Sequence, residues 1–159
     1  MPAKNDVSSG KINRYQIQSM RGITMENCIF CKIVNGQIPS YKIYEDEHTY
    51  AFLDIACDSY GHTLVIPKKH FTNVMDCDAE VLAHVIQTVQ KVANHYVDNC
   101  GFSGVNILNA SGKSAQQSVF HLHFHIIPRK DDDGMDTWPL HDKYELDLAQ
   151  ICNQLKLDK

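Results

Sequence analysis

Three histidines alternate with apolar residues in one short stretch, and this pattern constrains the fold more than any other feature of the chain. The stretch reads FHLHFHII over residues 120–127. Successive side chains of a β-strand point to opposite faces, so His121, His123 and His125 share one face and the apolar residues share the other. We therefore expect a strand over residues 119–127 with its apolar face in the core and its histidine face in a cleft.

The spacing of the three rings favours separate roles over joint ligation of one ion. Alternate residues of a strand lie about 6.6 Å apart, and the outer two histidines lie about 13 Å apart. A neighbouring pair such as His123 and His125 can still bind a catalytic zinc with a third ligand from elsewhere, so a metallohydrolase is one alternative. Without a metal, a neutral imidazole with an unperturbed pKa of about 6.5 is a nucleophile at neutral pH.

The rest of the pattern predicts an α+β fold with a mainly antiparallel sheet and one long helix packed across it. Apolar residues recur at helical spacing from Leu82 to Tyr96, with Asp76 or Asp78 as the N-terminal cap and Gly101 at the end. Further helices are predicted over residues 28–35 and around residues 144–155, and strands over residues 41–45, 49–55, 62–67 and 105–108.

The length of 159 residues suits one domain with its own core. Residues 1–24 differ from the rest, because they hold four basic side chains, one acidic side chain and no regular apolar pattern. We expect a flexible N-terminal extension there and one folded domain over residues 25–159. A weak organelle-targeting leader is the alternative for the extension.

Charge and hydropathy exclude two classes of partner. No apolar run approaches the roughly 18 residues that a membrane span requires, so we expect no membrane partner. The net charge of −4 argues against general nucleic-acid binding, which needs a basic surface. Six cysteines without a secretory signal favour a reducing, cytoplasmic location over disulfide pairing.

The ordered motifs around the histidine stretch resemble the histidine triad superfamily, in particular its Hint-like branch. The histidine motif continues into Pro128 and Arg129, as it does in that family. The matching stretches upstream are CIFCKI at 28–33, IP at 38–39, AFLDI at 51–55, HTLVIPKKH at 62–70 and QSVFH at 117–121. The similarity covers most of residues 25–138 and implies the HIT-like fold.

The resemblance implies a nucleotidyl hydrolase that attacks the α-phosphate of a purine nucleotide. His123 would be the nucleophile and would carry the nucleotidyl group until water hydrolyses it, while the carbonyl oxygen of His121 orients its ring. His125 and Ser118 would bind the phosphate and assist the leaving group, and His62 would support the histidines. The expected activity is that of a purine nucleoside phosphoramidase. The alternatives are a dinucleoside polyphosphate hydrolase and a nucleotide-binding or scaffold protein with incidental activity.

The same resemblance implies the contacts of the nucleotide. An apolar slot with one carboxylate suits a purine nucleoside, because a carboxylate accepts protons from both ribose hydroxyls. The implied residues are Phe30, Ile33, Phe52 and Ile55 around the base, Asp54 at the ribose, and Asn109, Gln117, Ser118, His123 and His125 at the phosphate. A plain core role is the alternative for Phe30, Phe52 and Ile55.

Two departures concern the phosphate loop. Gln116 stands where many relatives have a glycine, and residues 109–118 are one residue longer than in the best-known members. We therefore expect a different backbone around the phosphate.

A structural zinc site and a homodimer also follow from the resemblance. Cys28 and Cys31 form a CxxC pair, which is half of a zinc site. Relatives in the superfamily complete this pair with two histidines, which match His70 and His121 here, and the resulting Cys₂His₂ set is a closed structural site. The alternative is a pair of reduced buried cysteines beside a surface His70. In the implied homodimer the long helix and a strand of each subunit join, and residues near Trp138 approach the partner's site.

Overall fold

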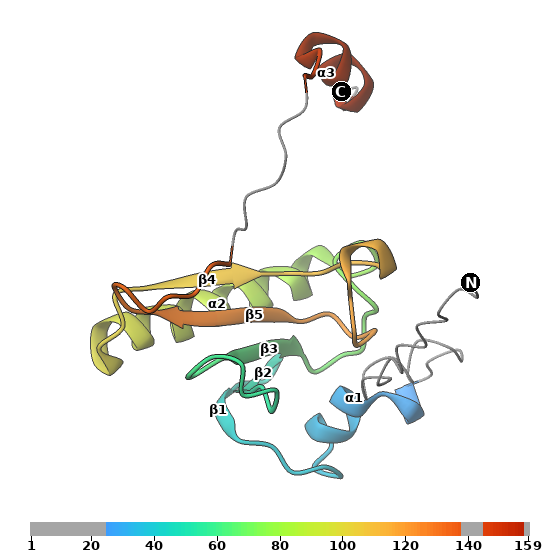
Figure 1. Ribbon diagram of the computed structural model, residues 1–159. Helices are drawn as coiled ribbons and strands as arrows, with labels where there is room; N and C mark the ends of the chain where they lie inside the picture. The colour runs from blue at the N-terminus through green and yellow to red at the C-terminus, as the bar shows by residue number, and fades with distance from the viewer. Residues whose placement is uncertain (1–24, 138–144, 158–159) are drawn as a thin grey trace, which may run out of the picture.

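One open antiparallel sheet with a long helix across it organises the molecule (Figure 1). The computed structural model describes residues 25–137 and 145–157. The strands are β1 (Lys42–Glu45), β2 (Thr49–Leu53), β3 (Thr63–Pro67), β4 (Gly104–Leu108) and β5 (Phe124–Arg129), in the order β1-β2-β3-β5-β4. All neighbouring strands run antiparallel, so the predicted α+β fold is confirmed.

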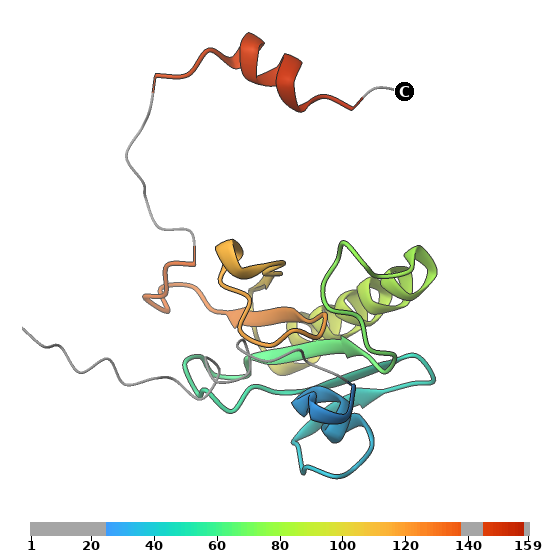
Figure 2. The same cartoon turned by 90° about the vertical axis from the view of Figure 1, so that its right-hand side faces the viewer.

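The helices are close to their predicted positions. They are α1 (Ile29–Val34), α2 (Ala79–Cys100) and α3 (Leu148–Leu155), with 3₁₀ turns η2 (Met25–Asn27) and η3 (Lys113–Ala115). None of the helices in the described residues is long and apolar enough to cross a membrane. Helix α3 buries none of its side chains and lies apart from the sheet in both views (Figures 1 and 2). The expected N-terminal extension, Trp138 and Tyr144 lie outside the described residues.

The central strands bury both of their faces. On one face Ala51, Val65 and Ile126 pack against the apolar stripe of α2, which includes Val89 and Val92. On the other face Phe52 and Leu64, among others, pack against α1. Because side chains alternate along a strand, β2 and β3 must supply apolar residues at nearly every position. This second face, under α1, is the one that carries the candidate site.

Helix α2 begins after Asp78, one of the two predicted caps, and ends at Gly101, which adopts the left-handed conformation with φ 73°. Asp78 is thus the N-cap residue, as predicted, but its side chain makes no capping hydrogen bond. The carboxylate of Asp78 binds Lys69 at 2.8 Å instead. The Asp76 carboxylate accepts the backbone N–H groups of Thr72 and Asn73, so it organises the preceding turn.

The predicted histidine strand is too long at its N-terminal end. Strand β5 begins only at Phe124 and pairs with β3 through residues 124–126. Upstream of it the backbone N–H of Leu122 donates to the carbonyl oxygen of Phe71 at 2.7 Å, in the loop that follows β3. This contact draws the chain out of the ladder, so His121 and His123 lie in a loop and only His125 lies in the strand.

A tight loop over residues 54–62 joins β2 to β3 beside the site. Gly61 has φ +78°, and a Cβ atom there would lie 3.2 Å from Cγ of Pro128. Glycine is therefore required by both the backbone conformation and the close approach to β5. The Thr63 hydroxyl donates to the Gly61 carbonyl at 2.9 Å and fixes the entry into β3.

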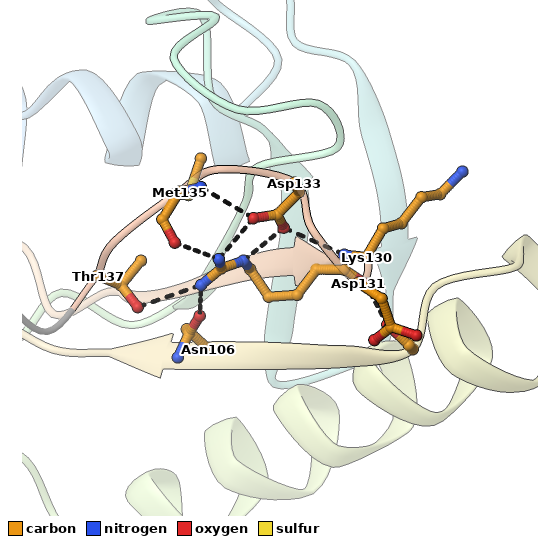
Figure 3. Close-up of polar contacts among 8 residues, drawn as sticks. Asn106, Lys130, Asp131, Asp133, Met135 and Thr137 are labelled. Carbon is orange, nitrogen blue, oxygen red and sulfur yellow. Dashed lines mark hydrogen bonds and ion pairs between the residues drawn. The ribbon is translucent and has the colours of Figure 1, made fainter.

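Arg129 closes the turn after β5 (Figure 3). Its guanidinium donates to both carboxylate oxygens of Asp133, at 2.6 and 2.7 Å, and to Asn106 of β4 at 2.6 Å. The carbonyl oxygen of Met135 and the hydroxyl of Thr137 accept further bonds. A bidentate arginine–carboxylate pair has a fixed geometry. Arg129 therefore holds the chain segment that leaves the sheet against β4.

Candidate active site

A cavity of about 340 Å³ opens on the face of the sheet that carries α1. Apolar side chains from α1, β2 and β3 form most of its wall, and a carboxylate, three hydroxyl groups and two imidazoles lie on the remainder. The predicted nucleotide-contacting residues that line the cavity are Phe30, Ile33, Phe52, Asp54, Ile55, Ser118, His123 and His125. The structure thus brings together eight side chains from segments far apart in the sequence.

Some residues that line the cavity are also part of the hydrophobic core. Phe30 and Phe52 are buried, and their rings meet edge to face with centroids 5.5 Å apart. Ile55 is 67% exposed at the rim, which excludes the alternative that it is a plain core residue. The sequence analysis missed further lining residues, among them Ile29, Ile38, Pro39, Ser40, Tyr41 and Leu64. Residues 38–39 belong to a matching motif and were therefore detectable, whereas no sequence signal marked the two that follow.

His123 is held in one ring orientation by the backbone. Its Nδ1 lies 2.6 Å from the carbonyl oxygen of His121, and its own carbonyl accepts the side-chain amide of Asn109 at 2.9 Å. Because a carbonyl only accepts, Nδ1 carries the proton and Nε2 of the neutral ring keeps a lone pair. The ring stands edge-on to Phe30 at 5.4 Å, and burial lowers the pKa of His123. A fixed, neutral imidazole with a free nitrogen is suited to nucleophilic attack.

His125 and His62 form a directly bonded pair beside His123. Nδ1 of His125 lies 2.8 Å from Nε2 of His62, and Nδ1 of His62 lies 2.7 Å from a carboxylate oxygen of Asp58. Burial lowers the pKa of His125 to about 4, so its ring is neutral at neutral pH. His62 therefore lies behind the cavity wall, in contact with His125. Asp58 was not among the predicted site residues.

Cys28, Cys31, His70 and His121 form a four-residue cluster, and their ligand atoms all lie within 4.8 Å of one another. The Nδ1 atom of His121 lies 3.4 Å from Sγ of Cys28, 3.6 Å from Sγ of Cys31 and 3.2 Å from Nδ1 of His70. Bonds of about 2.0–2.3 Å to a tetrahedral ion place its ligand atoms about 3.3–3.8 Å apart. The donor set and its spacing therefore fit a tetrahedral metal site.

The surroundings of the cluster support the same interpretation. Nε2 of His121 lies 2.9 Å from the carbonyl oxygen of Pro67, so it donates there and leaves Nδ1 free to face the sulfur atoms. Burial, together with the Cys28 thiol, raises the pKa of Cys31 to about 12. A cation in the cluster would offset this cost of a buried thiolate. His121 is completely buried here, outside the cavity that His123 and His125 line.

Comparison with known proteins agrees with this geometry. The HIT domain profile matches residues 35–132, which is more than half of the chain. The chain belongs to the HIT family. It is 50% identical over 134 residues to Protein hit of Bacillus subtilis, covering 82% of this chain and 92% of that protein. It is 38% identical over 130 residues to the adenosine 5'-monophosphoramidase HNT1 of Saccharomyces cerevisiae, covering 80% of each.

A solved structure of the same family extends the comparison. A Zn-bound histidine triad family protein from Mycobacterium smegmatis superposes with a TM-score of 0.68 at 38% identity. The similarity covers 75% of this chain and 86% of that one.

The side-chain amides of Gln117 and Asn109, which the sequence analysis expects at the phosphate, support the backbone around the HIT histidine motif. The Gln117 side chain donates to the carbonyl oxygens of Thr72 and Val119, at 2.6 and 3.0 Å, and accepts from the N–H of Gly112 at 2.8 Å. Asn109 holds the His123 backbone, as described above. In the structure, both amides therefore brace the wall of the cavity from behind.

Gln116 ends the 3₁₀ turn η3 in a left-handed conformation. Its φ is +63°, in the left-handed region that glycine adopts without steric cost. This chain forms the turn with a glutamine, which carries a steric cost in that conformation.

Proposed function

We propose that the protein is a nucleotidyl hydrolase of the phosphoramidase type, acting on purine nucleoside 5′-monophosphate derivatives. The observation that carries this proposal is the bond from His123 to the His121 carbonyl, which leaves Nε2 as a nucleophile beside His125 and Ser118. The yeast relative described above is named as an adenosine 5'-monophosphoramidase.

The shape of the cavity supports a purine nucleotide. Apolar walls formed by Phe30, Phe52 and Ile55 suit a flat base, and the Asp54 carboxylate suits the ribose hydroxyls. One oxygen of Asp54 already accepts the N–H of Ala56 at 2.8 Å, which fixes the direction of the carboxylate. A nucleoside in this slot has its 5′-phosphate at the histidine end of the cavity.

The chemistry has two steps. Nε2 of His123 attacks the α-phosphorus, a P–N bond to the ring forms, and the bond to the leaving amine breaks as the amine receives a proton. Water then attacks the same phosphorus and releases AMP and the free histidine. Ser118 and His125 provide hydrogen bonds to the phosphate oxygens, where negative charge concentrates.

We also propose that Cys28, Cys31, His70 and His121 hold a structural zinc ion. All four positions of a tetrahedral ion are filled by protein ligands, so the metal has no open position for a substrate. It would tie α1 and the loop after β3 to the segment that precedes His123. The Mycobacterium smegmatis neighbour is described as Zn-bound.

A homodimer through β4 and α2 completes the proposal. Strand β4 is an edge of the sheet, and its Ile107 is 48% exposed on the same face as α2, which itself exposes Ile86 and Val97. An open edge beside an apolar patch is a pairing surface. We expect Ile107→Lys to shift the protein from dimer to monomer in sedimentation equilibrium. Ile43→Lys, on the opposite edge strand β1, is the matched control, and a dimer that survives Ile107→Lys contradicts this interface.

All six cysteines lie in the described residues, and none of them forms a disulfide there. We therefore retain the proposal of a reducing, cytoplasmic location.

The decisive assay is AMP release from adenosine 5′-phosphoramidate by the purified protein, with and without a metal chelator. Turnover that resists the chelator supports a histidine nucleophile, because the enclosed zinc is not part of the reaction. Loss of turnover within the mixing time of the chelator would indicate the metallohydrolase alternative. Binding of AMP without turnover would indicate the binding protein, and selective cleavage of diadenosine polyphosphates would indicate the polyphosphate hydrolase.

A further inference from the structure

Asp58 is an exposed carboxylate that contacts the buried histidine pair behind the cavity. We propose that Asp58, acting through His62, positions His125 and supports proton delivery to it, so that His125 can protonate the leaving group. This inference rests on the proposed hydrolase function and deepens it. Of Asp58, His62 and His125, only His125 lines the cavity, so Asp58 is a positioning residue.

The distances describe a chain of hydrogen bonds and not a metal site. Asp54, His62 and His125 are close enough together to be considered as ligands. The two ring nitrogens of the pair are only 2.8 Å apart, however, which is shorter than the separation of about 3.3 Å between two imidazole ligands of one tetrahedral ion. The pair is therefore bonded through a shared proton, and the 2.7 Å contact to Asp58 continues the chain.

The carboxylate fixes the tautomer of His62. An ionised carboxylate only accepts hydrogen bonds, so Nδ1 of His62 must carry a proton. Nε2 of His62 then either accepts from His125 or, in the imidazolium form, donates to Nδ1 of His125. When His62 is an imidazolium and donates, Nδ1 of the neutral His125 ring is the acceptor. The proton of His125 is then on Nε2, the nitrogen that remains available to the cavity.

The charges around the pair favour placing the positive charge on His62. Asp58 touches its Nδ1, and a carboxylate oxygen of Asp54 lies 3.8 Å from its Nε2. His125 is buried beside His123 and His62, which lowers its pKa and opposes a charge on its own ring. Asp54 and Asp58 from the loop over residues 54–62, together with His123, are the titratable neighbours that face the pair.

The resulting step conserves protons. As the P–N bond of the substrate breaks, Nε2 of His125 gives its proton to the leaving amine, and Nε2 of His62 gives its proton to Nδ1 of His125. Both rings end neutral, with the Asp58 contact intact. During hydrolysis of the intermediate, water returns a proton to Nε2 of His125 and the two transfers reverse. The side chain of Asp58 is 61% exposed and that of His62 only 7%, so Asp58 is also the end of the chain that meets solvent.

The test compares two substrates that differ in their leaving group. An amine must be protonated to leave, whereas p-nitrophenolate leaves without a proton. We therefore compare kcat/KM for an N-alkyl adenosine 5′-phosphoramidate and for the p-nitrophenyl ester of AMP, in the unmodified protein and in Asp58→Asn. We expect a loss of about 10- to 100-fold with the amine substrate and of less than about threefold with the ester. Asp58→Glu restores most of the loss, and Asp98→Asn, which removes a carboxylate from the exposed surface of α2, changes neither value.

The pH profile gives a second readout. Asp58→Asn removes the charge that stabilises the protonated pair, so the alkaline limb of kcat/KM for the amine substrate moves about one pH unit lower. Equal losses with both substrates, at unchanged thermal unfolding and AMP affinity, would mean a merely structural role and would overturn the proposal. Full activity of Asp58→Asn on the amine substrate would overturn it as well. Ester hydrolysis by the unmodified protein and its loss in His123→Asn report on the proposed function separately from Asp58.

Discussion

Replacing His123 with asparagine is expected to lower the rate of AMP release from adenosine 5′-phosphoramidate by about 10⁴-fold or more, because the attacking nitrogen is lost. Asparagine keeps an N–H donor near the position of Nδ1 and can still bind the His121 carbonyl, which accepts the histidine at 2.6 Å. The cavity wall is therefore preserved. Steady-state kinetics measure the effect, and equilibrium titration with AMP should show an affinity within a few-fold of the unmodified value.

His95→Asn is the control for the loss of an imidazole, since His95 is exposed on α2. It should leave turnover unchanged. A His123→Asn protein that retains a tenth or more of its activity would contradict a nucleophilic role for this ring. A protein that loses AMP binding together with turnover would instead indicate that the substitution disrupts the cavity.

Replacing Cys28 with serine is expected to remove the bound zinc and to lower the free energy of unfolding by roughly 3–5 kcal/mol. Cys28 is 1% exposed, and its sulfur lies 3.4 Å from Nδ1 of His121. A serine hydroxyl does not replace a thiolate as a zinc ligand, and the remaining polar groups would be left buried without their ion. Elemental analysis and denaturant unfolding measure the two effects.

Cys100→Ser supplies the matched control, because Cys100 is an exposed free thiol at the end of α2. It should keep both the metal and the stability. Stoichiometric zinc in Cys28→Ser would place the ion elsewhere. A metal-free unmodified protein, purified without chelator, would favour a pair of reduced cysteines at this position.

The amino-acid pattern predicts the sheet and α2 well because burial there depends on local periodicity. Alternating and continuous apolar runs mark β2 and β3, and the helical spacing of valines marks α2. The N-terminal end of the histidine strand, β5, is not determined by local periodicity. Val119 and Leu122 are buried just as strand residues would be, but the ladder stops because Leu122 bonds to the distant Phe71 loop. Such a contact has no periodic signal.

The candidate site is likewise predictable from the sequence only in part. The chemical types of His123, His125 and Asp54, taken with the family resemblance, were enough to place them at one cavity. The partners of an amide side chain are a different problem, because Gln117 can bind a phosphate or three backbone groups with the same atoms. Asp58 lies in an irregular loop outside the matching motifs, so only the folded geometry shows its contact with His62.

The most direct test of the account is a search for the covalent intermediate. The protein is mixed with adenosine 5′-phosphoramidate radiolabelled at the α-phosphate, quenched during turnover in alkali, which preserves phosphorus–nitrogen bonds to histidine, and digested. We predict an acid-labile label on the peptide that contains His123 and none in His123→Asn. Full turnover without protein-bound label, or a label on another residue, would contradict the nucleophilic histidine on which the account depends.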